Sequence, residues 1–217
     1  MRGKHNGSVH SANSSGAYVR IKGTKVNPNT PSQQNVRNSF TANSKAWGNL
    51  SDAQRTQWNE YAKSVTITNV FGKVVPPTGF NYFMMLQGNL AAISQAGTQV
   101  PPGPVNIPVI TGLSGSANAT SEEVILTFSG LIDPNVNYQV FATAPQNPGV
   151  SFVKNQYRQI TVFNDTTTSP TDISEAYGSK FGDVLRAGKR IFIRLWAIHK
   201  TTGVPGEQVE CSMLIGS

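Results

Sequence analysis

Residues 185–215 read LRAGKRIFIRLWAIHKTTGVPGEQVECSMLI, and the spacing of their side chains decides the fold class of the C-terminal half. Alternation from Ile191 to Ile198 places Leu195 on one face of a β-strand and Trp196 on the other. A second run of strand-forming residues, Val209–Leu214, follows after a group of turn residues. The stretch therefore indicates β structure with a period of two.

Three earlier segments have the same character, namely Val124–Phe128, Tyr138–Ala142 and Ile160–Phe163. With an opening strand near Val109, the pattern gives about six or seven short strands in about 110 residues, which is typical of a β-sandwich. We therefore predict a β-sandwich over residues 109–217. Its predicted core residues are Leu126, Phe128, Val140, Ile193 and Leu195.

Residues 185–215 resemble part of a fibronectin type III module. The matching positions are Leu185, Gly188, Ile193, Leu195 and Ala197, and the resemblance implies a hairpin at Thr201–Gly206. Ala187 stands where that family has a proline, and Ile191 stands where it has a tyrosine. The family's tyrosine-corner hydrogen bond is therefore missing, so other immunoglobulin-like topologies stay open.

Upstream of the predicted sandwich, two capping boxes mark the starts of helices. In Thr30-Pro31-Ser32-Gln33 the threonine is placed to cap a helix over about residues 31–47, with proline at the first helical position. Ser51-Asp52-Ala53-Gln54 repeats the signal, and its aspartate suits the positive end of a helix. A third predicted helix runs from Gly79 to about Ser94.

These helices are expected to form a small domain, residues 30–97, joined to the sandwich by a Pro/Gly linker at residues 98–108. The whole chain is thus expected to be α+β. Aromatic side chains recur at helical spacing, which favours a packed core over a platform for stacking nucleic-acid bases. The predicted core residues of the helical domain are Val36, Phe40, Trp47, Trp58, Tyr61, Phe80 and Phe83.

Residues 1–29 show no hydrophobic periodicity and are expected to form an extended basic arm that is disordered when alone. Residues 1–63 hold nine Lys and Arg against two acids, whereas residues 64–217 hold nine of each. This asymmetry favours an acidic partner for the N-terminal part, although a solvated basic tail is the alternative. The residues expected to contact that partner are Arg2, Lys4, Arg20, Lys22 and Lys25.

The sequence offers little for catalysis or metal binding. Its three histidines have no metal-ligand spacing, and the single Cys211 excludes an intrachain disulfide. The segment GDVLRAGKR (182–190) departs from a phosphate-binding loop in spacing and in its last residue. No apolar run is long enough to span a membrane, and the first ten residues do not read as a secretory signal. We therefore expect a protein that is not an enzyme, with no cofactor and no metal.

Four segments occur in the order NPNTPSQQNVRNSF (27–40), AWGNLSDAQRTQWNEYA (46–62), TNVFG (68–72) and TGFNYFMMLQGNL (78–90), ahead of the predicted sandwich. In this order they resemble small structural proteins of tailed bacteriophages, especially those of Bacteroidetes-type hosts. The resemblance implies a virion component whose partners are other capsid or tail proteins. The low charge content, 13%, suits a structural protein better than a compact cytosolic enzyme.

Three hypotheses follow. The first is a capsid-associated decoration protein held by its arm and helical domain, with a tail or neck component as its variant. The second is a DNA-organising protein, because residues 46–62 are similar to the later helices of a high-mobility-group box and the arm could meet packaged DNA. The third is a glycan-binding module that uses Phe152, Tyr157 and Trp196.

Overall fold

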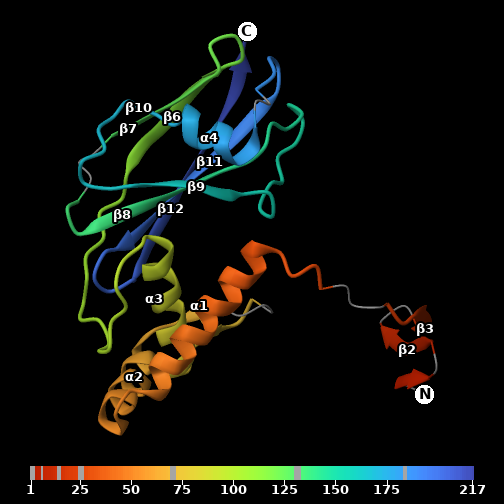
Figure 1. The fold of residues 1–217 in the computed structure, drawn as a ribbon, viewed down its shortest axis with the longest axis vertical. Coiled ribbons are helices and arrows are strands. Elements are labelled where there is room, and N and C mark those ends of the chain that lie inside the picture. Colours follow the sequence, from red (N-terminus) through yellow and green to blue (C-terminus); the bar gives the residue numbers. More distant parts are fainter. Residues whose placement is uncertain are drawn as a thin grey trace. The chain divides into compact units, whose positions relative to one another are not determined.

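A computed structural model describes residues 3–5, 7–13, 16–23, 27–68, 72–129, 133–182 and 185–217 (Figure 1). The chain is α+β, and its described part contains four helices and a large curled sheet of seven strands. It divides into two compact units, Met1–Asn38 and Ser39–Ser217. This division differs from the predicted one, which placed boundaries at residue 29 and in a linker at residues 98–108.

The N-terminal unit contains a three-stranded antiparallel sheet where an extended arm was expected. Its strands are β1 (Gly3–His5), β2 (Ser8–Asn13) and β3 (Gly16–Ile21), in the order β1-β2-β3. Lys22 N donates to Gly7 O at 2.7 Å and so closes the end of the β2–β3 pair. Every side chain of β3 is exposed. The sequence carries no strong strand signal here because that signal comes from a buried face.

Helix α1 (Pro31–Gly48) spans the boundary between the units and starts where the first capping box predicts. Gln33 N donates to Thr30 Oγ1 at 3.3 Å. The segment just before the helix, residues 27–29, is held against it, because the Arg37 guanidinium donates to Asn27 Oδ1 at 2.8 Å and to Asn29 Oδ1 at 3.1 Å. None of the residues of α1 is fully buried.

Helix α2 (Asp52–Ser64) begins with the complete predicted capping box, and α3 (Gly79–Ala92) is capped by Thr78. A short ribbon, β4 (Ile67–Thr68) with β5 (Val74–Val75), lies between these two helices in the chain. Trp58 is fully buried, and its ring meets Phe83 edge-on at 5.2 Å. Trp47, Tyr61 and Phe80 are half-buried; Trp47 meets Phe80 at 5.7 Å.

Two of the predicted helical core residues are not core residues. Val36 is 70% exposed and Phe40 is 59% exposed, so the prediction that they are buried was wrong. Helical spacing identifies the face on which side chains lie but not whether another element covers that face. On this face of α1, Trp47 is the residue that packs against the rings of α3.

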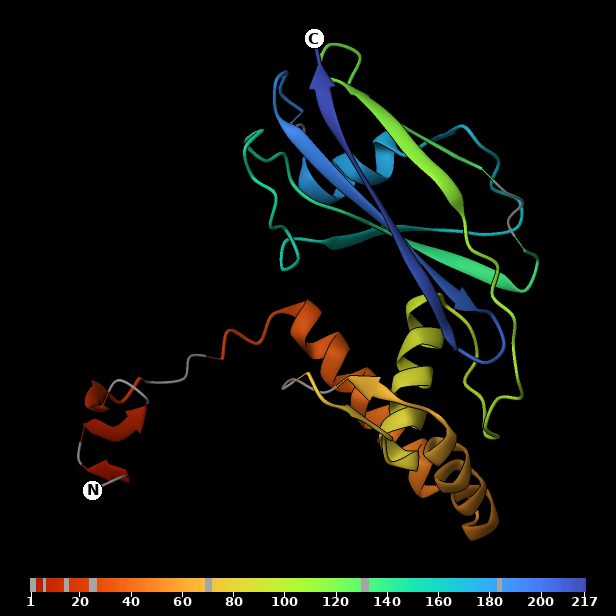
Figure 2. The same ribbon diagram turned by 180° about the vertical axis from the view of Figure 1, so that it is seen from behind.

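The seven-stranded sheet has the order β10-β7-β6-β12-β11-β8-β9 (Figures 1 and 2). Its strands are β6 (Thr111–Asn118), β7 (Glu123–Ser129), β8 (Val136–Ala142), β9 (Arg158–Phe163), β10 (Thr171–Asp172), β11 (Arg190–His199) and β12 (Pro205–Gly216). All neighbours are antiparallel except β12 and β6, which pair in parallel at Ile215 and Gly216.

The sheet curls so that side chains from strands near its two ends meet in the core. Phe128 of β7 and Phe163 of β9 lie near opposite ends of the strand order, yet their ring centroids are 5.9 Å apart. The curled sheet is compatible with a β-sandwich, and it encloses one apolar core. The predicted core residues Leu126, Phe128, Val140, Ile193 and Leu195 are all buried in it. Strand alternation therefore identified this core correctly.

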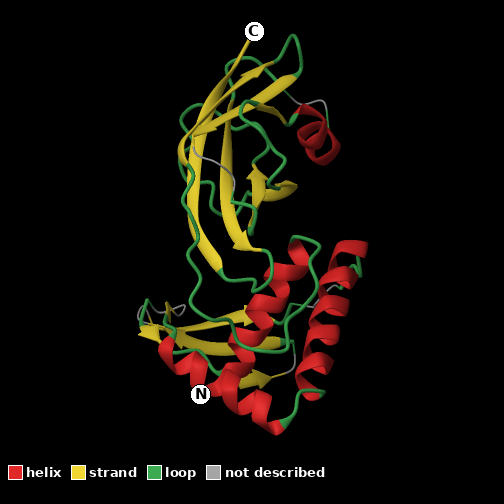
Figure 3. Ribbon diagram, turned by 90° about the vertical axis from the view of Figure 1, so that its left-hand side faces the viewer, coloured by secondary structure: helices red, strands yellow, loops and turns green. Residues whose placement is uncertain are grey.

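Helix α4 (Ser174–Phe181), which the sequence analysis missed, lies over one end of the curled sheet (Figure 3). Val124 N of β7 donates to Ser174 Oγ at 2.8 Å, and Ile173 N donates to Val124 O. The buried Tyr177 donates its hydroxyl to Thr143 O, at the end of β8, at 2.9 Å. The helix therefore links two strands that are not neighbours in the sheet.

Within the second unit, α3 packs against the sheet. Leu90 and Ile93 form an apolar cluster with Ile198 of β11. Asn89 Nδ2 donates to Gly203 O, in the β11–β12 hairpin, at 2.9 Å, and Gln159 Nε2 of β9 donates to Ala92 O at 3.1 Å. Figure 2 shows the end of α3 beside this hairpin. The helices and the sheet thus share one compact unit.

Replacing Gly203 by alanine should destabilise the unit more than the same change at Gly188. Both glycines have positive φ, 72° and 79°, which costs alanine about 1–2 kcal/mol. A Cβ at Gly203 would also overlap Leu86 O, whereas a Cβ at Gly188 meets open space. We expect Gly203→Ala to lose a further 1–3 kcal/mol, roughly, in urea unfolding. Equal losses would show that the α3–hairpin contact is loose.

The Tyr177 hydroxyl should contribute measurably to the free energy of unfolding. Burial raises the pKa of Tyr177, so the phenol stays protonated at neutral pH and donates to Thr143 O. Tyr177→Phe leaves that carbonyl without its donor and should cost about 1–2 kcal/mol in urea unfolding. Tyr18→Phe, at an exposed position of β3, serves as the control and should be neutral. Equal effects of the two changes would argue against the bond.

Candidate binding surfaces

The described residues contain no group of three or more His, Cys, Asp or Glu that could hold a metal ion. Within the same ranges, no helix is long and apolar enough to cross a membrane. Burial raises the pKa of Cys211 to about 11, so its side chain is a thiol at neutral pH and a poor nucleophile. Burial also lowers the pKa of His199, whose Nδ1 lies 3.0 Å from Thr202 Oγ1.

The strand register gives the N-terminal sheet two different faces. Directly opposite residues in antiparallel strands lie on the same face. The pairs Ala12–Ala17, His10–Val19 and Ser8–Ile21 therefore share one face, and the pairs Ser11–Tyr18 and Val9–Arg20 share the other. We call the first, with Ala12, Ala17, Val19 and Ile21, the apolar face. The second carries the cation Arg20.

None of the residues that the structure describes covers Val19 and Ile21 of the apolar face. Val19 is 60% exposed and Ile21 is 86% exposed, although both belong to a regular strand. A small sheet needs an apolar face buried against something to be stable in water. The charge of this part of the chain is one-sided, because residues 1–48 contain seven Lys and Arg and no acid.

The predicted arm residues are only partly described. Arg20 lies in β3 and Lys22 follows it, and both are exposed. Lys4 belongs to β1 and pairs with Val9. Arg2 and Lys25 lie outside the described residues.

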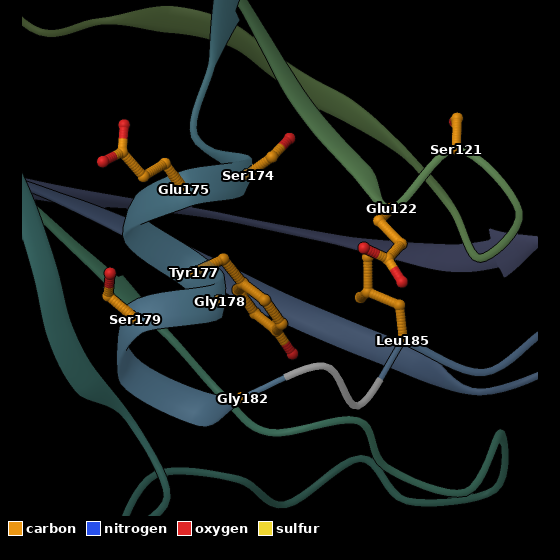
Figure 4. Close-up of a pocket in the computed structure, with 9 residues that line it drawn as sticks. All are labelled: Ser121, Glu122, Ser174, Glu175, Tyr177, Gly178, Ser179, Gly182 and Leu185. Atoms are coloured by element: carbon orange, nitrogen blue, oxygen red, sulfur yellow. The ribbon is translucent and has the colours of Figure 1, made fainter.

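Two hollows flank α4 at the end of the curled sheet. The first, of about 470 Å³, carries two carboxylates, Glu122 and Glu175, and no Lys or Arg among its lining residues (Figure 4). We call it the acidic hollow. In Figure 4 Glu122 lies on the β6–β7 turn near Leu185, and Glu175 lies on α4 with its carboxylate directed away from Glu122. Its other lining residues are Ser121, Ser174, Tyr177, Gly178, Ser179, Gly182 and Leu185.

The second hollow, of about 360 Å³, has the opposite charge. Arg186 and Lys189 line it together with the apolar residues Ala144, Pro145 and Phe181. We call it the basic hollow. The hollows share a wall, because Tyr177 lines the acidic one, Phe181 lines the basic one, and the two ring centroids are 4.9 Å apart.

Sequence reasoning did not identify either hollow. It gave Glu122 no role and examined residues 182–190 only as a possible phosphate-binding loop. The signal was present, since Asp172-Ile173-Ser174-Glu175 followed by Gly182 is a helix start with a glycine stop. Recognising α4 would have placed Glu175 near residues 185–189.

The aromatic residues considered for glycan binding do not form an open platform. Phe152 is 75% exposed. The Arg194 guanidinium covers the ring of Tyr157 at 4.0 Å from its centroid, and the Tyr157 hydroxyl donates to Glu210 at 3.2 Å. Trp196 is half-buried, and its ring lies 6.5 Å from that of Phe141. Of the three, only Phe152 displays its ring freely.

Comparison of the chain with protein-family models, with curated proteins and with solved structures gives no match.

Proposed function

We propose that the chain is a non-enzymatic structural component of a tailed-phage particle, a capsid-associated auxiliary protein held by its N-terminal unit. The single observation that carries the proposal is the uncovered apolar face of the N-terminal sheet, in a segment whose charge is entirely basic. The order of the four segments within residues 27–90 adds the resemblance to phage structural proteins.

An ordered segment must offset the free-energy cost of ordering its backbone. Fixing each residue costs about 1–2 kcal/mol of backbone entropy, which burial of apolar surface normally offsets. No residue described in β3 is buried, and Val19 and Ile21 project into solvent. A surface of this kind is stable once a partner covers it. The apolar face favours a partner with an apolar patch. The absence of acid in residues 1–48, with Arg20 on the other face of the sheet, favours a partner whose remaining surface is acidic.

The curled sheet is, in this proposal, an immunoglobulin-like sandwich of the fibronectin type III kind. Its seven strands, mostly antiparallel, surround one core, and Phe128 and Phe163 meet across it. Ile191 in place of the usual tyrosine, and the added helix α4, are departures from that family. Such a domain suits a rigid body that projects from, or packs upon, a repeated surface.

A second candidate is a DNA-organising protein. It is favoured by the seven Lys and Arg of residues 1–48, a segment that contains no Asp or Glu. The apolar face argues against it, because phosphates would neutralise Arg20 and Lys22 but leave Val19 and Ile21 in water. Binding of the full chain to duplex DNA, measured against salt, separates the two. Submicromolar binding near about 0.15 M salt with a steep salt slope would favour the DNA-organising function.

The proposal predicts that the protein is present in purified phage particles, in the head fraction. Mass spectrometry of separated heads and tails gives its location and copy number. Tens to hundreds of copies per head would support decoration of the capsid, whereas about six or twelve copies in tails would indicate a neck or tail ring. Absence from particles would overturn the structural function.

The same particles test the apolar face. Val19→Asp with Ile21→Asp should lower incorporation at least about tenfold, because a charged side chain cannot be buried in an apolar contact. Val100→Asp with Val109→Asp is the matched control, since both valines are also exposed and lie outside the N-terminal unit. Equal incorporation of both variants would show that the apolar face is not the attachment surface.

A further inference from the structure

We propose that two copies of the chain associate through the α4 end of the curled sheet, with the acidic hollow of each copy facing the basic hollow of the other. This goes beyond attachment through the N-terminal unit and does not depend on it. The occupant of each hollow is thus a second copy of the same chain.

The charges of the two hollows are not neutralised within the chain. Glu122 and Glu175 form no ion pair in the part of the chain that the structure describes, and neither do Arg186 and Lys189. Lys189 is held in place, because its ammonium donates to Asn147 Oδ1. Each hollow therefore has two like-charged residues, and no residue of opposite charge, among its lining residues.

The placement of the hollows fits a two-fold contact. In a symmetric dimer the same patch serves on both copies, so an acidic site must have a basic site beside it. The rings of Tyr177 and Phe181 form the wall between the hollows, with centroids 4.9 Å apart. Rotation by 180° about an axis near this wall would bring each hollow to the opposite hollow of the partner. The contact would contain four carboxylates and four cations.

The walls of the hollows would strengthen these pairs. Ion pairs on an open surface contribute little, but partial exclusion of water strengthens them. Leu185 lines the acidic hollow, and Pro145 and Phe181 line the basic one, so apolar atoms surround the charges. Tyr177 is itself fixed by its bond to Thr143 O, which keeps the wall rigid.

A second copy fits better than a separate small ligand. A cationic ligand would use the acidic hollow alone, and an anionic ligand would use the basic hollow alone. The net charge of residues 64–217 does not oppose contact between two copies of this part of the chain, because it holds nine basic and nine acidic residues. Pairing of copies thus uses both hollows at once.

Charge reversal in the full chain tests this proposal. One variant carries Glu122→Lys and Glu175→Lys, and the other carries Arg186→Glu and Lys189→Glu. In each variant alone, both hollows have the same sign, so association measured by analytical ultracentrifugation should weaken at least about tenfold relative to the unmodified chain. An equimolar mixture of the two variants restores opposite charges in both contacts and should recover a one-to-one complex.

The matched control is Lys45→Glu with Lys154→Glu, two exposed lysines of the second unit that lie outside α4 and line neither hollow. It changes net charge as much as the Arg186/Lys189 variant and should associate like the unmodified chain. Circular dichroism of every variant checks that it is folded. Association of the unmodified chain should also weaken at least tenfold, roughly, between about 50 mM and 500 mM NaCl.

Two results would overturn the proposal. The first is a monomeric unmodified chain at low salt and the highest concentration reached. The second is a mixture of charge-reversed variants that stays as dissociated as each variant alone. Neither result bears on attachment through the N-terminal unit, because that function is read from incorporation into particles.

Discussion

The pairing of β12 on both of its edges is the interaction on which the rest of the structure depends. This strand pairs antiparallel with β11 along most of its length and in parallel with β6 at its end. It therefore joins the half of the sheet that contains β10, β7 and β6 to the half that contains β11, β8 and β9. The common core exists because the joined sheet curls, which brings Phe128 to Phe163. The β11–β12 hairpin also receives α3, through Gly203 and Val204.

The sequence predicted those parts of the fold in which a local pattern and burial agree. Alternation identified Ile193 and Leu195 because every second residue of β11 is buried in the core. Capping identified α2 because Ser51 and Gln54 make both bonds of the box. It missed α4, because the N-cap residue Ile173 makes no side-chain bond and the helix-start signal comes from Asp172, one residue earlier. It also gave Phe40 a buried position, because spacing cannot report whether a neighbour is present.

The candidate surfaces were harder to predict, because they form only when separate segments of the chain come together. The one-sided charge of residues 1–48 is visible in the sequence, and it drew attention to the N-terminal part. The apolar face was not visible, since Ala12 meets Ala17 only through the pairing of two strands. The hollows depend on contacts between residues that are still further apart in the sequence. Glu122 and Glu175 lie more than fifty residues apart in the sequence, and they line the same hollow because Val124 N donates to Ser174 Oγ.

The two proposed contacts differ in the kind of partner they can accept, and this difference has a consequence for assembly. The N-terminal unit is basic throughout, so its copies repel one another and its surface suits a different, acidic partner. The α4 end carries both signs side by side, so its surface suits a copy of itself. A weak contact between copies becomes effective when each copy is already held on a repeated surface, because its neighbour is then at high local concentration. Pairing in free solution can therefore be weak and still order the chain once it is attached.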